Sequence, residues 1–440
     1  MSIFCFIILL LFFLIHVTKK HKKNWLIISL VGLYFISSVS SYFLYLSDVS
    51  YYRNVNLLSY LYLFIALVIS FYPITQYRPE RYVMIERMNI SIANIIAIFL
   101  IILFFINIVQ SIYTIRTDLT RILLDFSYAN DLYAENRDVT IEQTGNSFEH
   151  IPTVLSGMFS EILVIFTFYY LTLKKKNKII AVLLCVSLLF PFLDSFTRGS
   201  RTVMVWWFLE LFIAFFLLKD FYEERIIRKI KIIGSILSTF VIVIFSVLTI
   251  GRFEMNRYSS ISNAEDSFVS YLGQGSLNFS DMILQNDVHQ HGDNCFPLFL
   301  NLLGQESSSN LYERQEKWAG KMKIEQGSFY TFVGDICNDF GPFFGLVFIA
   351  LCSLIFDKMI NSNKRKVLSL SQILSLFFVC CICFNGMFYF SYKTIGGNLK
   401  IILYILVFFT LPFAKSLFNK EKNGTNNSIL PSSISSDKGE

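Results

Sequence analysis

Repeated long apolar runs constrain the fold of this chain more than any other feature. They fall at about 2–17, 25–46, 57–72, 90–113, 153–173, 179–193, 203–218, 232–250, 340–356, 367–392 and 401–418. A helix needs about 20 mostly apolar residues to cross a bilayer. Only 16% of the residues are charged, whereas about 25% is typical of soluble domains. The sequence therefore predicts an all-α polytopic membrane protein with about 11 transmembrane helices, in a range of about 10–12.

The basic residues predict the orientation of these helices. With the N-terminus outside, the clusters KKHKK at 19–23, KKKNK at 174–178 and NKRK at 363–366 all lie inside. Cytoplasmic loops carry an excess of Lys and Arg, so we expect an N-out/C-in protein. Residues 1–418 would form one transmembrane domain with two large, partly helical outer loops at 114–152 and 251–339. The polar residues 419–440 would form a disordered cytoplasmic tail.

Composition narrows the possible partners. The net charge of +6 comes from short basic clusters beside apolar runs, so we predict the lipid bilayer and not nucleic acid as a partner. Of the eight cysteines, only Cys295 and Cys337 lie in a polar loop, where they could pair in an oxidising space. The Cys and His residues do not have metal-site spacing, and we predict neither a metal nor a cofactor.

The hairpin FLDSFTRGSR at 192–201 is unusual because it carries Arg198 and Arg201 on the predicted outer side. Gly199 permits a tight turn before the next helix. Free N–H groups at a helix start favour an anion, and arginine binds phosphate oxygens in a bidentate manner. These residues predict a diphosphate site. Alternatively, both arginines extend to lipid headgroups or pair with Asp194.

Three stretches carry a family resemblance: RGSR at 198–201, YLGQGSLNFSD at 271–281 and TFVGDICNDFGPFFGLVF at 331–348. With the predicted topology, they resemble bacterial oligosaccharide repeat-unit polymerases, the Wzy-type O-antigen or capsule polymerases. The resemblance implies a glycosyltransferase-C-like architecture, shared with O-antigen ligases, in the cell inner membrane. It implies transfer of a growing glycan from undecaprenyl diphosphate to a new lipid-linked repeat unit on the outer face. Partners would include a chain-length regulator and a flippase.

The resemblance and the required chemistry together suggest site residues. The resemblance implies that Arg198 and Arg201 bind the diphosphate, and that Gly334, Asp335 and the segment 339–341, which includes Gly341, lie near the active site. Three further outer cations suit a developing negative charge, namely Arg252, Lys393 and Lys400.

The acceptor hydroxyl needs a base, and the sequence offers several candidates. Asp335 and Asp339 are four residues apart, so one helical face would present both. They could act in catalysis, bind sugar hydroxyls or favour a helix start. In HQHGD at 289–293, a strand would place His289, His291 and Asp293 on one side, as a metal site requires. His289 as a general base and an ordinary solvated loop are the other interpretations.

Two other features remain open. Glu161 and Glu210 lie inside apolar runs, where a charge is costly, and suggest structural or proton-linked roles. Residues 307–327 read as an amphipathic helix whose Trp318 would lie on headgroups or stack on sugar. Two rival functions also remain. One is a transporter or flippase for the same lipid-linked oligosaccharides, and the other is an O-antigen ligase.

Overall fold

The chain is almost entirely helical. The computed structural model describes residues 1–47, 49, 51–124, 151–197, 201–254, 262–308, 311–322, 324, 328–361 and 366–413. The helices are α1 Ser2–Lys20, α2 Trp25–Ser47, α3 Leu57–Gln76, α4 Ile90–Leu124, α6 Ile151–Thr172, α7 Lys178–Ser187, α8 Phe190–Thr197, α9 Arg201–Leu218, α10 Glu224–Glu254, α11 Ser262–Met282, α12 Pro297–Leu302, α13 Leu311–Trp318, α14 Thr331–Asn361, α15 Leu370–Asn385 and α16 Ile395–Phe413. Short 3-10 turns lie at Pro79–Arg81, Lys219–Phe221 and Ile283–Gln285, and the strands are β1 Met84–Ile85 and β2 Val367–Leu368.

Many of these helices have the length and apolar character of membrane spans. Within the described ranges, six helices meet both conditions: Ser2–Lys20, Trp25–Ser47, Leu57–Arg81, Ile90–Val109, Pro152–Thr172 and Thr331–Asn361. Leu370–Asn385 and Ile395–Thr410 are shorter apolar helices. Large apolar side chains are exposed on them, including Phe12, Ile102 and Phe344. These helices support the prediction of an all-α, multi-pass membrane protein.

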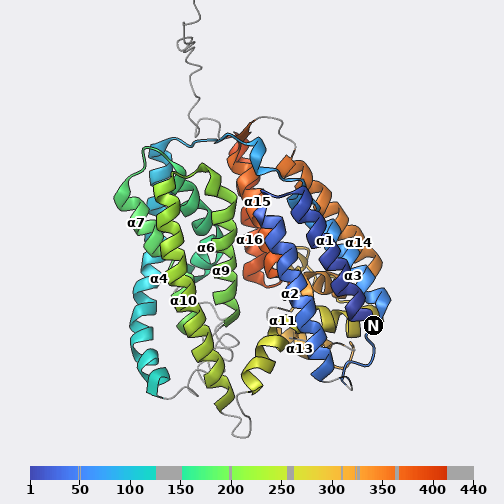
Figure 1. Ribbon diagram of the computed structural model, residues 1–440. Coiled ribbons are helices and arrows are strands. Elements are labelled where there is room, and N and C mark those ends of the chain that lie inside the picture. The colour runs from blue at the N-terminus through green and yellow to red at the C-terminus, as the bar shows by residue number, and fades with distance from the viewer. Residues whose placement is uncertain are drawn as a thin grey trace, which may run out of the picture.

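The bundle has two groups of helices with a pair between them (Figure 1). One group packs α1, α2, α3, α11 and α14 together, and the other packs α4, α6, α7, α8 and α9. Helix α15 contacts α2, α3 and α14 on one side and α9 on the other, while α16 contacts α6. The last two helices therefore connect the two groups.

Polar contacts define the two ends of the bundle. At one end, Asn24 Nδ2 donates to the carbonyl oxygens of Ile74 and Tyr77 at 2.9 and 2.8 Å. At this end β1 pairs in parallel with β2, with Met84 opposite Val367 (Figure 1). Helices α11 and α13 lie at the other end (Figure 1). The candidate site lies at this second end.

Several predicted runs differ from the observed helices. Helix α4 continues to Leu124, inside the predicted outer loop 114–152, and α16 begins at Ile395 and not at 401. The run 179–193 forms two short helices, α7 and α8, instead of one. Pro191 lies in the first turn of α8, where its missing N–H is tolerated, but it cannot continue a preceding helix. The predicted run 340–356 belongs to a helix that begins earlier, at Thr331, because residues 331–339 are all buried inside the protein.

Helix α14 is broken near its middle. Gly341 has φ 75° and ψ 169°, which is not helical, and Pro342 follows it. The break divides the helix into a buried first half, 331–340, and a second half, 342–361, that packs along α3. The hydroxyl of Tyr62 in α3 donates to the carbonyl oxygen of Pro342 at 2.6 Å, which satisfies a backbone group at the break.

Candidate functional site

The first turn of α14 is hydrogen-bonded to the loop that joins α15 to α16. The amides of Thr331 and Phe332 donate to the carbonyl oxygens of Phe388 and Gly386 at 2.9 and 2.8 Å. Thr331 has φ 66°, which is unusual for a β-branched residue. Its hydroxyl oxygen accepts from the amide of Gly334 at 3.3 Å. The start of this half-helix is thus held in a strained but well-bonded geometry.

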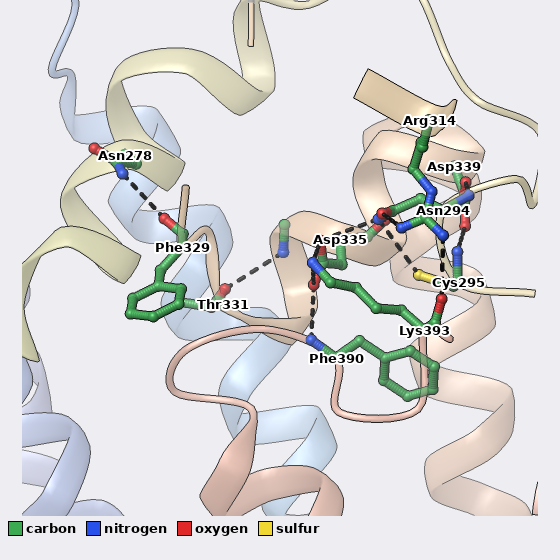
Figure 2. Close-up of polar contacts among 11 residues, drawn as sticks. Asn278, Asn294, Cys295, Arg314, Phe329, Thr331, Asp335, Asp339, Phe390 and Lys393 are labelled. Carbon is green, nitrogen blue, oxygen red and sulfur yellow. Dashed lines mark hydrogen bonds and ion pairs between the residues drawn. The ribbon is translucent and has the colours of Figure 1, made fainter. Parts of the chain in front are cut away.

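Asp335 is the centre of a buried polar cluster (Figure 2). Its Oδ2 accepts from the amide of Phe390 at 2.7 Å, and its Oδ1 accepts from Asn294 Nδ2 at 3.0 Å. Lys393 Nζ forms an ion pair with Oδ1 at 3.2 Å. The carboxylate is 2% exposed and the lysine side chain 15%. Asp335 and Lys393, which the sequence predicted for separate roles, therefore lie in direct contact.

Asp339 holds a neighbouring backbone segment. Its Oδ1 accepts from the amide of Asn294 at 3.0 Å, and its Oδ2 accepts from the amide of Cys295 at 2.7 Å. The residue is 0% exposed. The prediction that one helical face presents both carboxylates is confirmed, since Asp335 and Asp339 both contact the segment 294–295 from one side of α14. Both oxygens of Asp339 are already occupied, which favours a positioning role for this carboxylate.

Arg314 completes the cluster and is not among the site residues predicted from the sequence. It comes from α13, is 3% exposed, and donates from Nη1 to Asn294 Oδ1 at 3.1 Å and from Nη2 to the carbonyl of Lys393 at 3.3 Å. Its buried Nε has no hydrogen-bond partner, and none of the ion pairs between described residues includes it. The guanidinium therefore has one N–H donor, at Nε, that remains for an anion.

A sequence signal for Arg314 was present but weak. Arg314 and Trp318 are four residues apart on α13, and both face the protein, whereas Glu316 and Lys317 are exposed. The short helix α13 lies inside the amphipathic region 307–327 that the sequence predicted. Apolar residues at helical spacing mark the buried face of a helix. Arg314 lies on the buried face of α13 but is charged, so this pattern does not identify it.

The segment HQHGD forms turns and not a strand, so the interpretation with three ligands on one side is wrong. His291 has φ 52° and is exposed, while His289 packs against Gly341. The physical reason lies in α14: the amides of Gln290 and His291 donate to the carbonyl oxygens of Asn338 and Asp339 at 2.8 and 3.0 Å. The segment therefore satisfies the last carbonyl groups of the broken half-helix.

Asp293 is buried in its own set of donors. It accepts from the Ser308 amide at 2.6 Å, the Ser308 hydroxyl at 2.9 Å and Trp318 Nε1 at 2.7 Å, and Lys317 Nζ lies 3.1 Å away. Burial raises the pKa of Asp293, but these hydrogen bonds outweigh burial and leave its pKa below the ordinary value. Asp293 thus anchors α13, and Trp318 is bonded to the protein.

Gly341 and Gly334 are required as glycines for different structural reasons. A Cβ on Gly341 would lie 2.7 Å from His289 Nε2, and the backbone angles there suit only glycine. A Cβ on Gly334 would lie 2.8 Å from Tyr330 Cβ, so Gly334 allows close packing. Both predicted turn or helix-start glycines therefore lie beside the polar cluster.

We expect Gly341→Ala to destabilise the protein by about 2 kcal/mol, since it adds a Cβ where the backbone and His289 leave no room. The measurement is the unfolding free energy in mixed micelles. Gly32→Ala is the control, because Gly32 lies within α2 and a Cβ there meets nothing within 4 Å. An equal effect of the two substitutions would show that the break at Gly341 is not strained.

A second charged cluster lies within the apolar helices. Glu161 of α6 accepts from the hydroxyl of Tyr392 at 2.7 Å and pairs with Lys400 of α16 at 3.0 Å. Glu210 of α9 is also buried and interacts electrostatically with Glu161 and Lys400. Lys400 thus links α16 to α6 through Glu161, and Glu210 of α9 is a second buried acidic group close enough to interact with this pair.

The other residues predicted from the sequence are placed as follows or lie outside the described residues. Arg198 and Gly199 lie outside the described residues. Arg201 begins α9 and Arg252 lies near the end of α10, but the structure does not describe their side chains. Cys295 and Cys337 are both buried free thiols. Among the described side chains, no group of three or more His, Cys, Asp or Glu residues is arranged to hold a metal ion.

Comparisons with models of known protein families, with curated proteins and with solved structures found no match to this chain.

Proposed function

We propose that this chain is a membrane glycosyltransferase that polymerises lipid-linked oligosaccharide repeat units for a surface polysaccharide such as O-antigen or capsule. The observation that carries the proposal is the buried cluster of Arg314, Asn294, Asp335 and Lys393 beside the first half of α14. Such a cluster is costly to build at the end of an apolar bundle, and charged groups in membrane proteins are usually functional.

The reaction moves a glycan between two lipid-linked molecules. The bond between the anomeric carbon of the donor and the oxygen of undecaprenyl diphosphate breaks, and the diphosphate leaves with the electron pair. The acceptor hydroxyl oxygen forms the new bond to that carbon, and its proton passes to a base. We assign stabilisation of the leaving diphosphate to Arg198, Arg201, Arg252 and Lys393, because fixed cations suit charge that develops during the reaction.

His289 is the best candidate for the base. Its Nδ1 is buried without a hydrogen-bond partner, whereas the oxygens of Asp335 and Asp339 all accept hydrogen bonds from the protein. The unprotonated nitrogen of a neutral imidazole can accept a proton from a hydroxyl group. We therefore propose that Asp335 and Asp339 position the site and that His289 accepts the proton.

The arrangement of the ends supports an outer-facing site. The segments near Asn24, Tyr77 and β2 lie together, and the basic clusters 19–23 and 363–366 adjoin them in sequence. Helix α13, which carries Arg314, lies at the other end (Figure 1). We propose eleven crossings, N-out/C-in, in a glycosyltransferase-C-like architecture in the cell inner membrane, with a flippase supplying substrate and a chain-length regulator as a partner.

The test is elongation of undecaprenyl diphosphate-linked oligosaccharide, extracted from the same cells, by purified protein in lipid. We expect a ladder of longer lipid-linked products from wild type. Arg198→Ala with Arg201→Ala should lower its rate at least about 100-fold, because two cations at the leaving group are lost. Arg225→Ala with Arg228→Ala is the matched control, with the same spacing at the start of α10, and should retain activity.

The cluster of Glu161, Lys400 and Glu210 favours transport as a second candidate, since intramembrane charges also mark transport pathways. The same vesicles separate the two functions. Movement of the oligosaccharide across the bilayer without any lengthening would contradict the polymerase and support the transporter.

A further inference from the structure

Two apolar cavities lie end to end between α14 and α16. One has a volume of about 160 Å³ and the other about 270 Å³. They share four lining residues: Cys352, Phe356, Phe378 and Ile401. Both α14 and α16 pack against α15, so α15 forms the floor and the two other helices form the walls. We call these joined cavities the α14–α16 groove.

The groove ends directly beneath the polar cluster. Ile336 and Phe296 line its outer cavity and follow Asp335 and Cys295 in sequence. Phe390 also lines it, and its amide donates to Asp335 at 2.7 Å. Figure 2 shows that the amide of Phe390 points toward Asp335 while its ring points away. A molecule in the groove would therefore have its polar end at the cluster.

The walls suit a hydrocarbon chain. The hydroxyls of Ser353 and Ser375 line the groove but donate to the carbonyl oxygens of Ile69 and Ser371, so they offer no free donor. At the rim, Ile355 and Phe409 are 56% and 62% exposed, which leaves the groove open toward surrounding lipid. Lining residues run from Phe348 to Met359 of α14, a rise of about 16 Å, or roughly half of the hydrocarbon core.

Charge at the outer end indicates the headgroup. Arg314 is buried with an unpartnered Nε, and Lys393 lies beside Asp335. We propose that the α14–α16 groove binds the isoprenoid chain of the lipid-linked substrate and presents its diphosphate to Arg314 and Lys393. The inference rests on the proposed function, because that function supplies an anionic lipid with a long isoprenoid chain. Binding there would also orient the glycan toward the loops at this end of the bundle.

The test is photolabelling without turnover. Wild-type protein in phosphatidylglycerol nanodiscs receives undecaprenyl diphosphate that carries a diazirine in its chain, and mass spectrometry locates the adducts. We expect adducts on peptides that contain Cys352 or Ile401, displaced by unlabelled undecaprenyl diphosphate. Equal labelling there by a diazirine-bearing phosphatidylglycerol, or adducts elsewhere only, would overturn the proposal.

A matched pair of cysteines provides the control. Cys352→Trp fills the groove and should lower labelling at least about tenfold, the loss expected when about two methylene groups are no longer buried. Cys185 lines a separate apolar cavity of about 300 Å³ between α6, α7, α9 and α10, and Cys185→Trp should leave labelling unchanged. If Cys352→Trp does not fold, the adduct map of wild type still decides.

Binding and elongation can fail separately. Adducts in the groove of a protein that does not elongate the oligosaccharide would support lipid binding in the groove and contradict the polymerase function. Elongation with adducts elsewhere would support the polymerase function and contradict lipid binding in the groove.

Discussion

Asp335→Asn is expected to destabilise the protein by about 3 kcal/mol, since it leaves Lys393 without its anion in a largely buried position. An asparagine also cannot accept from both Phe390 and Asn294 as the carboxylate does. The measurement is equilibrium unfolding in mixed micelles with a denaturing detergent. Asp287→Asn is the control, because Asp287 is exposed in the same region, and it should change stability by less than about 0.5 kcal/mol.

A double-mutant cycle isolates the ion pair. Lys393→Met removes the cation, and the double variant Asp335→Asn with Lys393→Met should be more stable than the sum of the two single effects predicts. A coupling near zero would show that the two charges do not interact. For elongation, Lys393→Met should also slow the proposed reaction, whereas Asp287→Asn should not.

Lys400→Met is expected to have the largest effect in the transmembrane region, a loss of about 3 to 5 kcal/mol. It leaves Glu161 as a buried carboxylate without its cation, beside a second buried acidic group, Glu210. Glu161→Gln should cost much less, because the nearby Glu210 can then ionise and interact with Lys400. The same unfolding assay measures both variants, with Lys358→Met as the control, since Lys358 is an exposed lysine on α14.

This asymmetry is specific to three charges that share one site. A simple pair of Glu161 and Lys400 would make the two single variants equally harmful. Glu210→Gln should partly restore stability to Lys400→Met, because it removes the acidic group that disfavours the charge on Glu161. If Glu210→Gln instead leaves Lys400→Met unchanged, Glu210 does not belong to the cluster.

Local chemistry in the sequence was sufficient for most helices. Long apolar runs specify helices in a membrane protein because lipid offers no hydrogen-bond partners to the backbone. Helix starts can also be read locally, as in the capping box of Ser369 and Gln372 before α15. The split of 179–193 was also readable, since Pro191 marks it. The early start of α14 was not, because residues 331–339 mix polar and apolar side chains.

The candidate site was predicted in part. The sequence indicated Asp335 and Asp339 on one helical face and the two intramembrane glutamates, because spacing and the cost of buried charge are local properties. It did not indicate that Lys393, 58 residues from Asp335, pairs with it. Nor did it single out Arg314, since an arginine on an amphipathic helix usually lies on the exposed face.

By itself, then, the sequence determined an all-α chain of apolar helices with its charged residues concentrated between them. Only the tertiary structure decided which polar side chains meet. Asp335 pairs with Lys393, Glu161 pairs with Lys400, and the neutral amide of Asn294 joins Asp335 to Arg314. The physical reason is that helix formation depends on neighbours within a few residues, whereas a buried ion pair depends on how distant helices pack.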